Sequence, residues 1–188
     1  LLTKVPQAAN AVVIVDVERT LKAPLAEKEG WGKELELAYV SRPIFLPPEA
    51  TKLVMAANLQ AGESFRRQWE LAVMQLAEPM GMRSIARSEG GYVDTLRDKD
   101  VAWTPSDAYF VGLNDRQLGV VYPADRQFTS WWIAFAEQNN RPMLSDYLSE
   151  ATKNTSDQVQ ILQANDLTDI VQPHELDQRI QDSPLFKK

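Results

Sequence analysis

Three aspartates at predicted strand ends and turns could carry the chemistry that a chain without cysteine performs most readily. Asp16 follows the apolar run "AVVIV", Asp166 ends "DQVQILQAND", and Asp107 lies in the turn "PSDA". Paired carboxylates can act as general acid and general base. A strand-end aspartate more often caps the next helix by accepting backbone N–H bonds. A carboxylate site at one edge of a sheet is therefore one hypothesis, and local capping is the alternative.

Four aromatic side chains form a second candidate site. Trp103, Tyr109 and Tyr122 belong to neighbouring predicted strands, and Trp132 lies on a predicted helix beside Trp131. Adjacent helical residues point about 100° apart, so one tryptophan should face the sheet and the other its flank. The four aromatics could line an apolar pocket or form a docking face. Ordinary core packing is the alternative.

The composition does not favour several other classes of function. The absence of cysteine excludes disulfides and thiolate metal sites. The single histidine, His174, lies among acids in a polar stretch and is expected to be solvated, so we predict no metal site and no cofactor. A net charge of -6 disfavours nucleic acid as a partner. The longest aliphatic run, "AVVIV", is far shorter than the roughly 20 residues of a spanning helix, so we predict no membrane insertion.

The elements that must position these residues can be read from periodicity and turn signals. Strands are predicted over 11–17, 52–60 and 157–166, and as a four-strand meander between 92 and 122. Short helices follow the first strand, with a bend at Pro24, and another ends at Gly90-Gly91. Further helices are predicted over 125–139 and 144–153. This pattern indicates an α+β fold, a mostly antiparallel sheet with helices packed on one face.

The helix over 125–139 has the clearest pattern. Asp125 is its expected N-cap, and aromatic residues recur along one side. We predict that it packs across the meander through a stripe of Phe128, Trp131 and Phe135, so that replacing one of these by alanine costs about 3–5 kcal/mol.

The end of the chain repeats a motif from its beginning. "SPLFKK" at the C-terminus resembles "APLAEK" near the N-terminus, and each follows an apolar strand and a helical stretch. Chance recurrence is the alternative to a duplicated architecture that is cut short. The chain then divides into an α+β domain over 1–166 and the start of a second repeat, or a helical tail, over 167–188. An open sheet edge or a bare tail would recruit a protein partner or a second copy.

Several segments together resemble a family of uncharacterised, exported bacterial proteins. The matching stretches include "NAVVIVDVERTLKAPLAEKEGW", "WELAVMQL", "IARSEGGYVDTL" and "PADRQFTSWWIAF". The resemblance implies an exported location, periplasmic or extracellular, with a cytoplasmic one the alternative. It implies that this chain is an N-terminal portion, and it supplies no activity. It also favours a strand over 68–76, where residues 65–76 fit a helix face equally well.

These observations lead to two functional hypotheses. The first is a non-enzymatic binding or assembly domain that acts through its sheet face or its tryptophan-bearing helix. The second is a hydrolase or small-ligand protein that uses strand-end carboxylates. A deep cleft with two carboxylates within hydrogen-bond reach would favour the second, and a large exposed apolar patch would favour the first.

Overall fold

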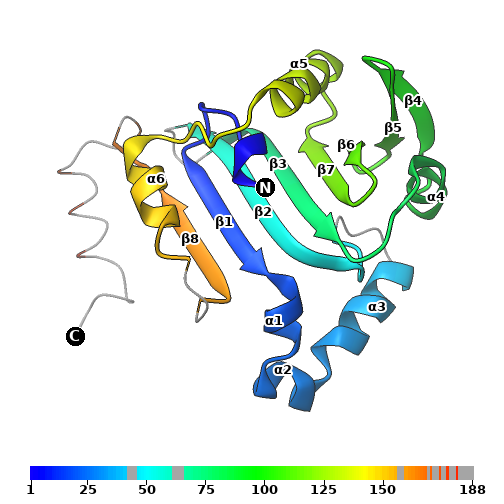
Figure 1. The fold of residues 1–188 in the computed structure, drawn as a ribbon, viewed down its shortest axis with the longest axis horizontal. Coiled ribbons are helices and arrows are strands. Elements are labelled where there is room, and N and C mark those ends of the chain that lie inside the picture. Colours follow the sequence, from blue (N-terminus) through cyan, green and yellow to red (C-terminus); the bar gives the residue numbers. More distant parts are fainter. Residues whose placement is uncertain are drawn as a thin grey trace.

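The computed structural model describes residues 1–41, 46–60, 66–155, 159–168 and 170, with the isolated positions 174, 177 and 181. Within these ranges, eight strands form one antiparallel sheet (Figure 1). The strands are β1 (Ala11–Asp16), β2 (Ala50–Gln60), β3 (Arg66–Leu76), β4 (Tyr92–Leu96), β5 (Lys99–Thr104), β6 (Ala108–Asn114), β7 (Gln117–Tyr122) and β8 (Ile161–Asn165). The helices are η1 (Leu2–Lys4, a 3-10 turn), α1 (Val17–Leu21), α2 (Pro24–Glu29), α3 (Trp31–Ser41), α4 (Met82–Ser88), α5 (Arg126–Gln138) and α6 (Asp146–Thr152).

The strands lie in the order β4-β5-β6-β7-β3-β2-β1-β8, and each neighbouring pair is antiparallel. The predicted α+β class and the antiparallel meander, β4 to β7, are confirmed. The ambiguous segment is a strand, β3, as predicted. Register shifts in the β2–β3 and β6–β7 pairs increase the local twist, and the sheet curves visibly at β2 and β3 (Figure 1).

Helices cover both faces of the sheet, so the expectation of helices on one face is wrong. Val73 and Met74 are neighbours in β3 and both are fully buried. Val73 belongs to a core that includes Trp132 of α5, and Met74 belongs to a second core that includes Ile85 of α4. Successive strand residues point to opposite faces. The unbroken apolar run "LAVM" in β3 is the signature of a strand buried on both sides.

α5 packs on the meander as predicted, but only part of the predicted stripe faces the core. Its buried residues are Thr129, Trp132, Ile133 and Ala136. Asp125 caps the helix as expected, because its carboxylate accepts a bond of 2.7 Å from the Phe128 N–H. The small Thr129 and Ala136 on the buried side let the helix approach the strands closely. Phe128 and Phe135 of the predicted stripe are half-buried and pack against this core, whereas Trp131 is half-exposed, so the stripe lies at the margin of the buried side.

The predicted stripe instead forms a row of rings on the flank of α5. Trp69 of β3 stacks on Phe128 with ring centroids 5.3 Å apart, and Phe128 lies 5.6 Å from Trp131. Trp131 is 5.5 Å from Phe135 and remains 50% exposed, whereas Trp132 is fully buried. The expected division of the two tryptophans between sheet and flank is confirmed.

The helices after β1 form a chain of three short segments where one helix, a bend and a second helix were expected. Pro24 occupies the first turn of α2, and Gly30 ends that helix at φ 75°, a conformation that glycine adopts without strain. Figure 1 shows α1 to α3 beyond the C-terminal end of β1. In the described ranges, no helix is both long enough and apolar enough to cross a membrane.

β8 is the last strand of the described sheet and lies beside β1. It pairs antiparallel with β1, from Ala11 opposite Asn165 to Val15 opposite Ile161. The strand predicted over 157–166 therefore joins the sheet formed by the earlier strands. Most of the segment over 167–188 lies outside the described residues, so the second-repeat and tail hypotheses, and docking through that segment, stay predictions.

Candidate ligand pocket

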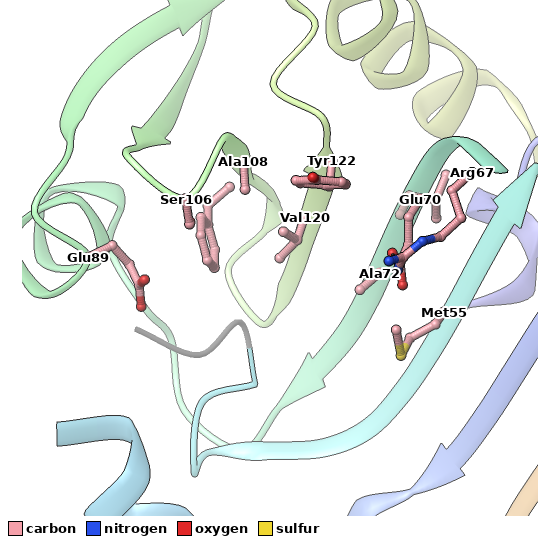
Figure 2. A pocket seen from close by; sticks show the side chains of 11 residues that line it. Met55, Arg67, Glu70, Ala72, Glu89, Ser106, Ala108, Val120 and Tyr122 are labelled. Carbon is pink, nitrogen blue, oxygen red and sulfur yellow. The ribbon is translucent and has the colours of Figure 1, made fainter. Parts of the chain in front are cut away.

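A cavity of about 440 Å³ opens on the sheet face that carries α4 (Figure 2). Its apolar lining consists of Met55, Leu71, Ala72, Ala108, Phe110 and Val120. The volume lies within the range of small-molecule sites, and such sites combine an apolar lining with a few polar groups.

The floor of the pocket is one transverse row of the sheet. Met55 pairs with Ala72, Ala72 pairs with Val120, and Val120 pairs with Phe110, so the row crosses β2, β3, β7 and β6. Residues directly opposite each other in neighbouring strands share a face. The hollow lies over this row because the short side chain of Ala72 stands between larger neighbours.

The polar groups of the pocket stand on opposite sides. Figure 2 shows Glu89 and Ser106 on one side and Glu70 with Arg67 on the other, with Tyr122 near the upper rim. Glu70 and Arg67 form an ion pair. The pocket thus contains two carboxylates, but one is already paired and the two are separated by the apolar floor.

Glu89 is the unusual group of this site. Glu89 directly follows the last turn of α4, and the residue is only 7% exposed. Among the described residues, neither of its carboxylate oxygens makes a hydrogen bond, and burial raises the pKa of this carboxyl. Burying an ionised carboxylate without a partner costs free energy, and this cost is why the pKa moves upward.

Two glycines hold Glu89 in this place. Gly90 adopts φ 70°, which turns the chain out of α4. At Gly91, an added β-carbon would lie 1.8 Å from the carbonyl oxygen of Trp103, so only glycine permits this close approach to β5. The "GG" pair was predicted only as a helix stop, and the structure shows that it also fixes the carboxyl beside the sheet.

The antiparallel sheet separates the first two candidate aspartates. Asp16 ends β1 beside Gln160, while Asp166 follows β8 and donates its N–H to the carbonyl of Asn10, at 2.7 Å. Because β1 and β8 run in opposite directions, their C-terminal ends lie at opposite ends of the pair, roughly 20 Å apart. Asp16 and Asp166 therefore do not form a carboxylate pair.

Each of the three candidate aspartates accepts a hydrogen bond from another part of the fold or from its own turn. Asp16 caps α1 by accepting from the Arg19 N–H at 3.0 Å. Asp107, at φ 61°, accepts from the Ala124 N–H at 3.3 Å. Asp166 accepts from the Ser145 hydroxyl at 2.6 Å, and this bond is the largest cause that lowers its pKa. Asp16 thus matches the helix-capping alternative, whereas Asp107 and Asp166 connect segments that are distant in the chain.

The four candidate aromatics do not share one pocket. Trp132 and Tyr109 are core residues, with 0% and 5% exposure, and Trp103 packs against the same core. Only Tyr122 lines the cavity, because it lies on the opposite face of the sheet. Trp103 instead contacts Tyr92 near the β4 edge, with the rings tilted and their centroids 5.2 Å apart.

Two other hollows are lined by the candidate aspartates. One, of about 590 Å³, includes Asn10, Asn58 and Asp166, and the other, of about 390 Å³, includes Asp16. In the first, the side chain of Asn10 exchanges two bonds with the backbone of Leu59, at 2.8 and 2.7 Å. Its polar groups are thus used by the fold, which leaves the pocket beside Glu89 as the stronger candidate site.

Comparison of the chain with protein-family models, with curated proteins and with solved structures found no match. The likeness to exported bacterial proteins stays a prediction. Over the described part of the chain, no group of three or more histidine, cysteine, aspartate or glutamate residues could hold a metal ion. The isolated His174 is exposed.

Proposed function

We propose that this domain is a non-enzymatic binding protein whose sheet-face pocket holds the apolar body of a small ligand. The observation that carries the proposal is the floor of Met55, Ala72, Val120 and Phe110, which lines a hollow of about 440 Å³. Removing apolar ligand surface from water would supply most of the affinity.

The polar groups support binding rather than catalysis. A catalytic acid and base must both reach the reacting atoms, usually within hydrogen-bond distance. In the pocket, Glu70 is paired with Arg67 and lies across the floor from Glu89. The hydroxyl of Ser106 lies 2.8 Å from that of Thr104, with no base among its described partners. These groups suit orientation of a ligand better than bond cleavage.

The proposal can be tested with N-phenyl-1-naphthylamine, a neutral apolar probe whose fluorescence rises in apolar sites. We expect saturable binding by the native chain. Ala72→Leu should weaken it by about tenfold or more, because the larger side chain occupies the floor. Ala77→Leu is the matched control, since Ala77 is exposed and lies outside the lining.

The result that would overturn the proposal is an absence of saturable binding, or equal affinity in the native chain and the Ala72→Leu variant. Circular dichroism of both variants checks that the fold is retained. An exported location, and association through a sheet edge or the C-terminal tail, are inferred separately from the sequence.

A further inference from the structure

One end of the pocket carries a carboxyl group, Glu89, with no cation beside it among the described lining residues. Glu89 is only 7% exposed and its carboxylate has no hydrogen-bond partner in the described ranges. Among the described lining residues the one cation is Arg67, which forms an ion pair with Glu70 on the other side of the floor. Glu89 lines the hollow, so a ligand that enters it can reach this carboxyl group.

A second carboxylate lies within electrostatic reach. Glu49, just before β2, has a buried Oε2 without a hydrogen-bond partner. Burial raises the pKa of Tyr39 on α3, a bond to Ser88 lowers it, and the charges of Glu89 and Glu49 raise it further. The Tyr39 ring therefore lies close enough to feel both carboxylates. Glu49 therefore adds negative charge near Glu89, although it is not one of the residues that line the hollow.

We propose that this end of the pocket binds the ammonium group of a small primary amine, with Glu89 as its ion partner. The proposal rests on the proposed function, since the apolar body of the amine would lie over Phe110 and Val120. An ammonium group supplies three donors, and the carboxylate of Glu89 has no hydrogen-bond donor among the described residues. Charge-assisted bonds of this kind are about twice as strong as neutral ones.

Other ligand classes fit this end less well. An anion would meet the carboxylates of Glu89 and Glu49 in a chain whose net charge is -6. A divalent metal needs several oxygen ligands, and in the part of the chain that the structure describes no group of three acidic or histidine residues is assembled. A neutral alcohol could accept a bond from protonated Glu89, so it is the competitor that an experiment must separate from the amine.

Three matched probes make that separation: 4-phenylbutylamine, 4-phenylbutan-1-ol and 4-phenylbutyrate, which share one apolar body. Their affinities are measured by calorimetry at pH 7 on the full chain. We expect the amine to bind about tenfold or more tightly than the alcohol, and the carboxylate to bind weakest. Glu89→Gln keeps the shape and removes the charge, so it should abolish the preference for the amine while the alcohol still binds.

Glu78→Gln is the control for net charge, because Glu78 is exposed and outside the pocket lining. It should keep the preference for the amine. Equal affinity of native chain for amine and alcohol would overturn the amine proposal while leaving the apolar pocket intact. A preference that survives Glu89→Gln, or that disappears in Glu78→Gln, would overturn it as well. If none of the three probes binds, the proposed function itself is wrong.

Discussion

The indole ring of Trp132 lies directly against the α-carbon of Gly119. A β-carbon added to Gly119 would be 2.3 Å from Cη2 and 2.8 Å from Cζ3 of the ring. The ring is fixed at its other side, because Nε1 donates to the carbonyl oxygen of Lys4 at 2.8 Å. This contact joins α5, β7 and the N-terminal turn, and it sets how closely the helix approaches the sheet.

Gly119→Ala should therefore be destabilising. The methyl group can be accommodated only if the indole ring or the helix moves, and such overpacking costs about 1–3 kcal/mol. For a chain of this size the melting temperature should fall by about 2–4 °C per kcal/mol. Gly112→Ala in the neighbouring strand is the control, because its β-carbon would meet only Met82 Cε at an ordinary 3.6 Å. Equal melting temperatures for the two variants would contradict the close contact.

The two adjacent tryptophans should respond very differently to removal. Trp132→Ala leaves a cavity under α5 and should cost about 3–5 kcal/mol. Trp131→Ala removes a half-exposed ring that contacts Phe128 and Phe135, and such ring contacts contribute about 0.5–1.5 kcal/mol each. Urea unfolding followed by circular dichroism measures both losses. Equal losses would mean that the outer row of rings stabilises the domain as much as the core does.

Much of the fold could be predicted because its signals are local. The turn residues of the meander and the cap at Asp125 depend on nearby chain alone, and each was placed correctly. The buried side of α5 was predicted only in part, since Phe128 and Phe135 pack against the core but Trp131 is half-exposed. Which side of α5 can approach the strands closely depends on the sheet, with Gly119 and its neighbours.

The site was harder to predict because it is made by residues distant in the chain. Met55, Ala72, Val120 and Phe110 become one row only through the strand order, which places β7 beside β3. Glu89 looked like an ordinary polar residue before "GG", and its burial depends on how the chain leaves α4. The aspartates at strand ends were more visible in the sequence, yet antiparallel pairing directs Asp16 and Asp166 to opposite ends.

Glu89→Gln should raise the stability of the ligand-free protein at neutral pH. The pKa of Glu89 is raised in the folded state, so the native chain binds more protons than the unfolded chain between the ordinary and the folded pKa. The carboxyl therefore lowers stability as the pH rises through that window, and the full cost persists above it. Below the ordinary pKa of glutamate, the native chain and the Glu89→Gln variant should have the same melting temperature. Thermal melts from acidic to neutral pH test this.

A glutamine variant that melts at or below the native temperature at pH 7 would show that the ionised carboxylate is stabilised in place. Glu78→Gln again serves as the control and should not alter the pH dependence. Together with the amine affinities, the result separates a group kept for ligand binding from one that supports the fold.

Asp166 should stabilise the fold, in contrast to Glu89, because its carboxylate accepts hydrogen bonds from neighbouring groups. It accepts from the Ser145 hydroxyl at 2.6 Å and from the Thr168 hydroxyl at 2.7 Å. Ser145 in turn accepts from the Leu148 N–H at 3.3 Å, as the N-cap of α6. The aspartate thus links the end of β8 to the start of α6. Asp166→Ala should cost about 1–3 kcal/mol and weaken hydrogen-exchange protection at Leu148.

The pH dependence of stability is a second test of the link between β8 and α6. The pKa of Asp166 is lowered, so its contribution to stability is present above the ordinary aspartate pKa and is lost as the pH falls through the folded value. The difference in unfolding free energy between the native chain and Asp166→Ala should therefore shrink in strong acid. Asp100→Ala, which removes an exposed strand aspartate, is the control and should leave Leu148 protected. If Asp166→Ala is as stable as the native chain at pH 7, the link between β8 and α6 does not depend on this carboxylate.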